Sequence, residues 1–262
     1  MISEEAIASA KKHARQVFPA ESCGIVIKGE YLPCENKALP ADQHESDNEN
    51  CRCVLCSFSI ADDVYLRHAH EIEAVIHSHP YGPEFPSRAD MAAQIASGLT
   101  WGIIALDEER IGNPVFWGGR EPIKPLIGRE FRHGITDCYD LIRDTYALGR
   151  RELGKQGITG WPYESIELPR YARDDAWWEK PEFDFYNIEP FKIGFREINM
   201  DEAKPGDIFL VKIRSNKFNH GGVLIGNDLI LHHLPNRLSR REPSGLWARQ
   251  AERWLRWKGD TA

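Results

Sequence analysis

The sequence has no long apolar run, no internal repeat and few cysteines. None of its hydrophobic stretches approaches the roughly 20 residues that span a bilayer. The segment from Met1 to Pro19 lacks the apolar centre of a secretory signal, so we expect the chain to fold in a cytoplasm. Six cysteines in 262 residues are too few for a disulfide framework. The net charge of −7 gives no electrostatic reason to expect nucleic acid as a partner.

What is present is an ordinary globular composition in a chain long enough for two domains. Glycines and prolines over 118–128 predict a boundary, which gives domains at 1–120 and 121–262. In the first domain, apolar patterns predict helices over 4–17, 62–73 and 87–98, turns over 32–50, and strands over 23–27, 73–76, 101–106 and 115–117. In the second, we expect a helix over 138–148, an irregular stretch to 187, and strands over 208–213, 220–225 and 229–233. This order predicts an α+β fold.

Two histidines separated by one residue follow the predicted strand at 73–76. Alternate side chains of a strand point to the same side, so His77 and His79 can share one metal ion. Ser87 and Asp90 follow, on adjacent parts of the first turn of a predicted helix. Two imidazoles, one carboxylate and a water form the open set of a catalytic zinc, which turns the water into a nucleophile. Ser87 could donate a hydrogen bond to the oxyanion.

The string HSHPYGPEFPSRAD resembles the signature of the JAMM/MPN metalloproteases, a His-x-His followed by Ser-x-x-Asp. That family also requires an upstream glutamate beside a strand, and Glu21 in PAESCGIVI matches it. The resemblance implies a deaminase-like α/β/α domain in which His77, His79 and Asp90 bind zinc. It also implies that Glu21 activates the water and that Ser87 steadies the tetrahedral intermediate.

A second His-x-His pair, His68 and His70, provides an internal comparison. The position where the aspartate should follow is Tyr81. The pair also lies in a predicted helix, where a two-residue spacing points the side chains apart. We therefore predict that His68 and His70 are not part of a catalytic site.

The predicted helix of the second domain begins at a cysteine, Cys138. Helix-end amides lower the pKa of a thiol and favour the thiolate. A nucleophilic cysteine also needs a base close in space. His220 and His232 lie on two predicted antiparallel strands, so His220 could be the base and His232 the group that orients it. His233, which alternation places on the opposite face, is an alternative for the third position.

This pattern resembles the NlpC-type cysteine peptidases, which cleave peptide stems of the bacterial cell wall. Asp-Cys on a helix, Lys-Pro-Gly-Asp before a strand and Asn-His-Gly-Gly-Val opening the next carry the resemblance. It implies a papain-like α+β domain with Cys138 as nucleophile, His220 as base and His232 as third member. Tyr139 and Asp140 depart from the small residue and glycine of that family, and the long stretch before His220 could form a lid or a partner surface. The alternative is a buried structural cysteine beside unrelated histidines.

The order of the two domains resembles the tail assembly protein K family of phages like lambda, as do PAESCG, Gly-Arg-Glu-Phe at 128–131 and DCYDLIRDTY. The resemblance implies a zinc-dependent and thiol-dependent hydrolase in tail-tip assembly. Its implied partners are tail-tip proteins and peptidoglycan peptides, in the host cytoplasm during assembly or at the tail tip of the virion. The alternative is a non-catalytic assembly chaperone or scaffold that keeps the active-site residues as binding surfaces.

Three weaker patterns leave alternatives open. Cys51, Cys53 and Cys56, with His44 nearby, could bind a second, structural zinc or could be small apolar thiols of an edge strand. The aromatic residues over 177–186 could stack on sugar or pack in a core. The arginine-rich C-terminal end could contact anionic polymers or form a solvated helical face.

Overall fold

The structure is a computed structural model that describes residues 2–45 and 51–259. The chain divides into two compact units, Met1–Glu121 and Pro122–Ala262. Both units combine helices with one sheet, which confirms the predicted α+β class. The elements of the first unit are α1 (Glu4–Val17), β1 (Cys23–Ile27), β2 (Glu30–Cys34), the 3₁₀ turn η1 (Ala41–Gln43), α2 (Asp62–His68), β3 (Ile72–Pro80), α3 (Arg88–Ser97), β4 (Thr100–Leu106) and β5 (Val115–Gly118).

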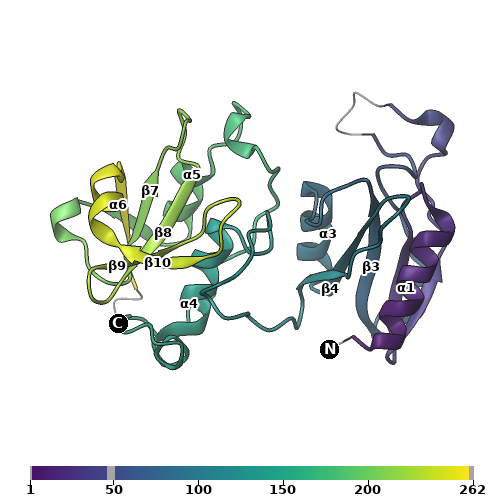
Figure 1. Cartoon of the computed structure of the whole chain (residues 1–262), viewed down its shortest axis with the longest axis horizontal. Helices are drawn as coiled ribbons and strands as arrows, with labels where there is room; N and C mark the ends of the chain where they lie inside the picture. Colours follow the sequence, from purple (N-terminus) through teal and green to yellow (C-terminus); the bar gives the residue numbers. More distant parts are fainter. Residues whose placement is uncertain (1, 46–50, 260–262) are drawn as a thin grey trace. The chain divides into compact units, whose positions relative to one another are not determined.

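The first unit is a five-stranded sheet of order β2-β1-β3-β4-β5 between helices. Neighbouring strands are antiparallel except β3 and β4, which are parallel and joined through α3. Figure 1 shows α1 on one face of this sheet and α3 on the other. Ala6 and Ala10 of α1 pack against Ile76 of β3, since small side chains let the helix approach closely. Because Ile76 faces α1, alternation along β3 turns His77 and His79 toward α3.

Two local predictions in this unit are corrected. The turns expected over 32–50 overlap β2, which pairs with β1 across a turn in which Lys28 and Gly29 both have positive φ. The helix expected over 62–73 ends at His68, and His70 lies in the turn before β3. The structure of both segments depends on strand pairing, of β2 with β1 and of the strand β3 that follows α2. Local composition does not reveal this pairing.

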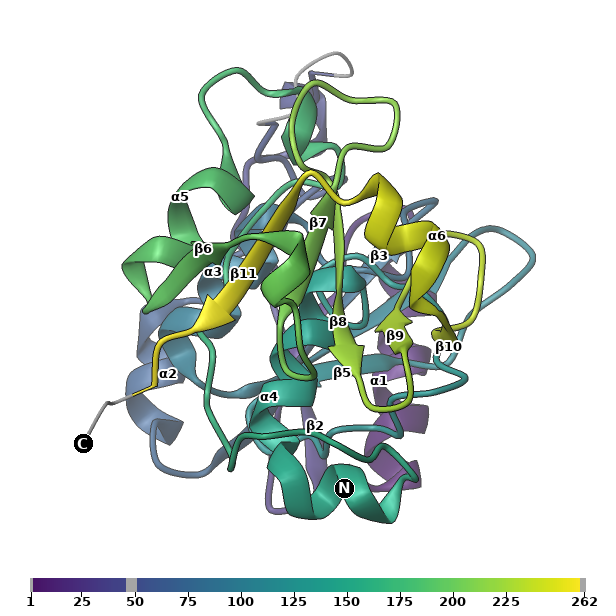
Figure 2. The same cartoon turned by 90° about the vertical axis from the view of Figure 1, so that its left-hand side faces the viewer.

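The second unit holds one antiparallel sheet of order β10-β9-β8-β7-β11-β6. Figure 2 shows these strands side by side, with α4 behind the sheet and α6 in front of it. Ile142 and Tyr146 of α4 pack with Val223 of β8, whereas Trp247 of α6 packs with Phe209 on the opposite face. The elements are α4 (Cys138–Lys155), η2 (Trp177–Glu179), α5 (Phe185–Lys192), β6 (Phe195–Ile198), η3 (Met200–Glu202), β7 (Ile208–Val211), β8 (His220–Ile225), β9 (Leu229–His232), β10 (Arg240–Pro243), α6 (Ser244–Gln250) and β11 (Arg253–Trp257).

The irregular stretch after α4 is packed against that helix. The helix is interrupted at Gly149, where φ is 63°, and a Cβ there would lie 2.5 Å from the backbone nitrogen of Ser165. Trp161, Trp177 and Phe185 are buried in the core. Trp178 and Phe183 are partly buried and pack against the same core. These contacts favour the packing alternative left open by the sequence.

The arginine-rich C-terminal end forms the strands β10 and β11 on either side of α6, and Arg249 of α6 is exposed. β11 lies between β7 and β6. Arg256 donates hydrogen bonds of 2.9 and 2.7 Å to the two carboxylate oxygens of Asp207, and Arg253 lies 3.1 Å from Glu197. These ion pairs neutralise the arginine charges of β11. The polar composition of this segment does not predict a strand.

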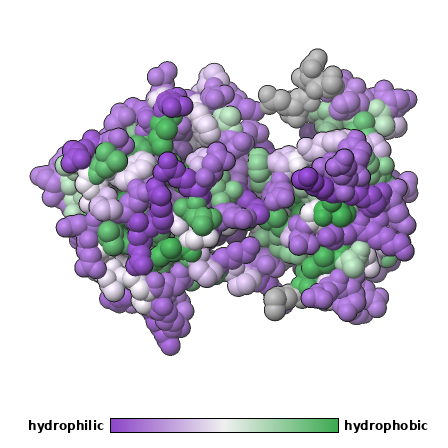
Figure 3. All heavy atoms as spheres, in the orientation of Figure 1, coloured by the Kyte–Doolittle hydropathy of each residue, from purple (hydrophilic) through white to green (hydrophobic). Residues whose placement is uncertain are grey.

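Figure 3 shows hydrophilic residues over most of the visible surface of each unit, with smaller apolar patches between them. Within the described residues, no helix is long and apolar enough to cross a membrane.

Close packing at Gly222 gives a stability prediction. Gly222 lies in β8 between β7 and β9, and a Cβ there would lie 2.6 Å from the Leu231 oxygen. We expect Gly222→Ala to lower the free energy of unfolding by about 1–3 kcal/mol, because backbone blocks the new methyl group. Gly154→Ala in α4 meets nothing within 4 Å and should raise it by up to about 1 kcal/mol. Urea denaturation followed by tryptophan fluorescence compares them; equal stabilities would contradict this packing.

Candidate metal centre and thiol site

The pairing of β1 with β3 brings the predicted general base to the histidine pair. Its register, extended beyond β1, places Glu21 opposite His79. At this point the Ser22 N–H donates to Ser78 Oγ at 2.8 Å, and the Ser78 N–H donates to the Ser22 carbonyl at 3.0 Å. The Glu21 N–H donates to the Val54 carbonyl at 2.7 Å. Glu21 is therefore held from both sides beside the histidines.

The three predicted metal ligands converge. The Nε2 atoms of His77 and His79 lie 3.0 Å apart, and they lie 3.4 and 3.5 Å from the two carboxylate oxygens of Asp90. Tetrahedral zinc with bonds of about 2.0–2.1 Å spaces such ligand atoms about 3.3 Å apart. All three side chains are buried. The donor set and its spacing therefore fit one metal ion.

Each imidazole is oriented by its surroundings. The Nδ1 atom of His79 lies 3.0 Å from the Pro83 carbonyl, so it donates there and leaves Nε2 as the free donor atom for a metal. The His77 ring packs between aromatic rings, with centroids 4.6 Å from Phe58 and 5.8 Å from Trp101. Among the described residues, Nδ1 of His77 has no hydrogen-bond partner. On the Nδ1 side, packing and not hydrogen bonding fixes the His77 ring, whereas Nε2 faces His79 and Asp90.

Ser87 orients the carboxylate ligand. Its hydroxyl donates to Asp90 Oδ2 at 2.7 Å and accepts from the Asp90 N–H at 3.1 Å. Its own N–H donates to the same carboxylate oxygen at 2.8 Å, which completes a capping box at the start of α3. The oxyanion contact predicted for Ser87 requires the hydroxyl to turn away from Asp90, and it stays a prediction.

The two carboxylates of this site titrate differently. Burial raises the pKa of Glu21 to about 8, and the charge of Asp90 adds to that shift while His79 opposes it. Burial also acts to raise the pKa of Asp90, but His77 and His79 hold it well below its ordinary value. A pKa near neutrality suits a general base, and a cation bound beside Glu21 would lower that pKa again.

In the second unit the predicted base and third member are in contact. His220 begins β8 and His232 ends β9, and His220 Nε2 lies 3.2 Å from His232 Nδ1. The sequence analysis missed a further residue of this cluster, Glu242 of β10. Its carboxylate lies 3.4 Å from His232 Nε2 and accepts a 2.8 Å hydrogen bond from Trp247. Only the pairing of β9 with β10 brings this carboxylate close. His233 instead lies against Phe131 and Arg237.

The Cys138 thiol lies at the start of α4 against β8. The Gly221 backbone, next to His220, forms a hydrogen bond with it, and the Tyr186 hydroxyl lies 3.6 Å away. Burial raises the pKa of Cys138 to about 11, with a further contribution from Asp137, which outweighs these hydrogen bonds. Our expectation that the helix end favours the thiolate is therefore wrong for this environment, since burial is the larger effect. Burial also lowers the pKa of His220, which is neutral at neutral pH.

The two departures from the NlpC pattern contact the long stretch that follows α4. The Tyr139 hydroxyl donates to the Pro169 carbonyl at 2.7 Å. Asp140 accepts a hydrogen bond from Arg173 at 3.2 Å, and the same guanidinium bonds Asp137 at 2.6 Å. Asp137, Asp140 and Arg173 are all buried. Tyr139 and Asp140, which follow Cys138, therefore anchor this long stretch.

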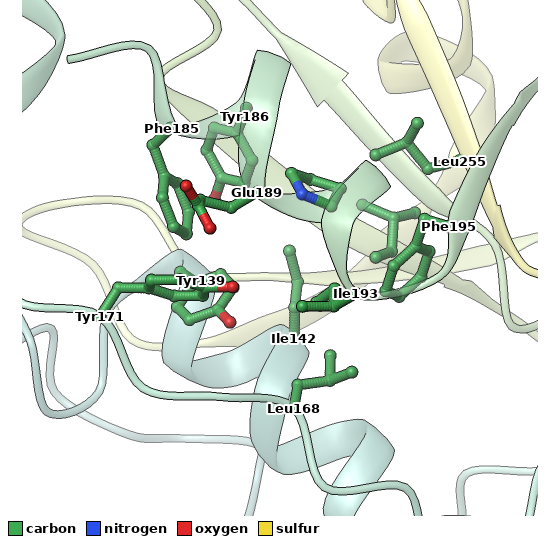
Figure 4. Close-up of a pocket in the computed structure, with 12 residues that line it drawn as sticks. Tyr139, Ile142, Leu168, Tyr171, Phe185, Tyr186, Glu189, Ile193, Phe195 and Leu255 are labelled. Carbon is green, nitrogen blue, oxygen red and sulfur yellow. The ribbon is translucent and has the colours of Figure 1, made fainter. Parts of the chain in front are cut away.

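A cavity of about 20 Å³ lies where α5 meets α4 (Figure 4). Aromatic side chains line much of it, among them Tyr139, Phe185 and Tyr186, together with Glu189 and aliphatic residues. A space of this size holds about one water molecule, and Cys138, His220 and His232 do not line it. It is a packing gap beneath the stretch that covers α4, and too small for a peptide.

Comparisons with known proteins follow the same division. Residues 3–117 match a model of prokaryotic homologs of the JAB domain, and residues 112–255 match the NlpC/P60 family. Tail tip assembly protein K of Escherichia phage lambda is 32% identical over 189 residues, 71% of this chain and 78% of that protein. Tail tip assembly protein K of Escherichia phage N15 is 30% identical over 258 residues, 94% of this chain and 91% of that protein. The chain belongs to this family.

Membership in the protein K family confirms the resemblance drawn from the motifs and their order. Two solution structures are also similar in part. A protein from Desulfitobacterium hafniense covers 47% of this chain and 92% of its own, with 17% identity and a TM-score of 0.31. A protein from Salinibacter ruber matches over 44% of this chain and 79% of its own length, with 19% identity and a TM-score of 0.27. Neither adds to the family assignment.

The raised pKa of Cys138 predicts slow alkylation. Only the thiolate attacks iodoacetamide, so we expect the rate at Cys138 in the folded protein to rise with pH toward a midpoint near 11. In urea the same residue should show the ordinary thiol midpoint of about 8.5. Mass spectrometry of the Cys138 peptide measures both profiles, and identical midpoints would show that burial does not control the thiol.

Proposed function

We propose that this chain is a peptidase of phage tail-tip assembly with two hydrolytic centres. The names of its relatives support the assembly role. The convergence of His77, His79 and Asp90, with Glu21 opposite, is the observation that carries the enzymatic part. The proposed activities are zinc-dependent hydrolysis of peptide or isopeptide bonds in the first unit and thiol-dependent cleavage of peptidoglycan stem peptides in the second.

In the first unit, contacts within the protein already hold the proposed metal ligands in place without substrate. Zinc, when bound, polarises a carbonyl oxygen and makes a water more acidic. Glu21 accepts a proton from the attacking water and passes it to the leaving nitrogen. Pro83 holds the His79 ring and Ser87 holds the Asp90 carboxylate, so the ligand geometry depends on little rearrangement.

In the second unit, Cys138 attacks the carbonyl carbon of a stem peptide while His220 takes the thiol proton and later gives it to the leaving amine. The bond to His232 occupies Nε2 of His220, which leaves Nδ1 for the thiol. Glu242 holds His232 in turn. Because the resting thiol is neutral, proton transfer has to accompany the attack.

We propose that the protein acts with tail-tip proteins in the host cytoplasm during assembly, or at the tail tip of the virion. A wall endopeptidase suits a tail that has to open peptidoglycan locally. The second candidate function is a non-catalytic assembly chaperone or scaffold. The neutral, largely covered Cys138 thiol, in contact with Tyr186, favours it for the second unit.

Zinc content tests the first centre with a matched control. His77→Ala removes one of three converging donors, so we expect the purified protein to lose one equivalent of zinc. His68→Ala removes a histidine of the other His-x-His pair and should lose none. Plasma mass spectrometry of dialysed protein measures both. Equal zinc contents in the two variants would rule out the His77 centre.

Product analysis tests both activities. The protein is incubated with muropeptides and with tail-tip proteins, with and without a chelator, and products are identified by mass. We expect both Glu21→Gln and chelation to lower the rate of the zinc-dependent cleavage by at least about a hundredfold. Cys138→Ala should stop the thiol-dependent cleavage, and Cys34→Ala, the control for loss of a thiol, should not. Infectious tails from a Glu21→Gln, Cys138→Ala double variant would favour the scaffold.

A further inference from the structure

A second group of potential metal ligands lies in the first unit, apart from the His77 centre. His44 and the thiols of Cys51, Cys53 and Cys56 place one ligand atom each within 4.8 Å of the others. His44 Nδ1 lies 3.3 Å from the sulfur of Cys53 and 3.6 Å from that of Cys51, and the sulfurs of Cys53 and Cys56 lie 3.5 Å apart. All three cysteines are free.

We propose that these four residues bind a structural zinc ion. Tetrahedral zinc, with bonds of about 2.3 Å to sulfur and 2.0–2.1 Å to nitrogen, separates sulfur atoms by about 3.8 Å and a sulfur from a nitrogen by about 3.6 Å. The three observed separations lie within a few tenths of these values. A disulfide would need about 2.05 Å between sulfurs, so the 3.5 Å pair is not a disulfide.

The local backbone supports the same geometry. The Cys56 and Ser57 N–H groups both donate to the Cys53 carbonyl, at 3.1 and 3.0 Å. This turn brings the thiols of a Cys-x-x-Cys pair to one side, as structural zinc sites require. Three thiolates select a soft ion over magnesium or calcium. Four protein ligands also leave no open position, so the site is structural, unlike the three-residue set at His77.

The proposed ion would fasten the segment that forms one side of the His77 centre. The Val54 N–H, next to Cys53, donates to the Leu39 carbonyl at 2.8 Å, and the Val54 carbonyl accepts from the Glu21 N–H at 2.7 Å. Phe58, two residues beyond Cys56, packs on the His77 ring. The zinc would thus hold the backbone that holds Glu21. This positioning effect on activity rests on the proposed function, whereas the ion site itself does not.

The test is the number and ligand type of zinc ions in the full-length chain, purified under reducing conditions. We expect two zinc ions per chain in the wild type. Cys53→Ser, Cys56→Ser should retain one, and His77→Ala, Asp90→Asn should retain the other. Cys34→Ala, which removes a thiol outside the cluster, should retain both. X-ray absorption should show zinc–sulfur distances of about 2.3 Å in the wild type, in the His77 variant and in Cys34→Ala, but not in the Cys53→Ser, Cys56→Ser variant.

The X-ray absorption spectrum of the wild type tests the proposed cysteine-bound zinc even if the cysteine variant fails to fold. One zinc without sulfur ligands would overturn this proposal and leave the His77 centre intact. One zinc with sulfur ligands would support it and remove the metal from the proposed function. A mass two hydrogens below the reduced value, located to the Cys53–Cys56 peptide, would overturn it in favour of a disulfide.

Discussion

The antiparallel pairing of β1 with β3 is the constraint on which the first site depends. Its register sets Glu21 opposite His79, and a shift of one residue would turn both histidines toward α1. The register is itself specified by apolar packing, because Ala74 and Ile76 are buried against Ala6 and Ala10. The pattern that forms the hydrophobic core therefore also aims the imidazoles, and α3 then needs only to present Asp90 from its first turn.

In the second unit, burial works against formation of the Cys138 thiolate. It raises the pKa of the Cys138 thiol more than a helix end can lower it. Arg173 pairs with Asp137 and Asp140 in the same interior. Buried ion pairs of this kind add little net stability but strongly penalise the loss of one partner. The start of α4 is thus tightly specified, and burial there favours the neutral form of the Cys138 thiol.

The sequence predicts most of the first unit, because spacing within single elements determines it. The Ser87–Asp90 capping box and the helix stop at Gly98 are local signals. Features that depend on distant pairing were not predictable from local spacing, and Glu21 was predicted only through the family resemblance. Glu242 reaches His232 only through the β9–β10 register, and β11 is concealed because its arginines pair with acidic residues far along the chain. The thiol pKa was wrong for a related reason, since sequence spacing does not report depth.

The contacts of Tyr139 and Asp140 have an evolutionary consequence. The first makes its hydrogen bond to Pro169, and the second shares Arg173 with Asp137, so both depend on the long stretch after α4. Deleting that stretch alone would leave a buried carboxylate with fewer cations, and restoring a small residue and glycine alone would leave Arg173 with fewer anions. Ancestors and descendants of this domain should therefore gain or lose the stretch and the two residues together, as one inherited unit.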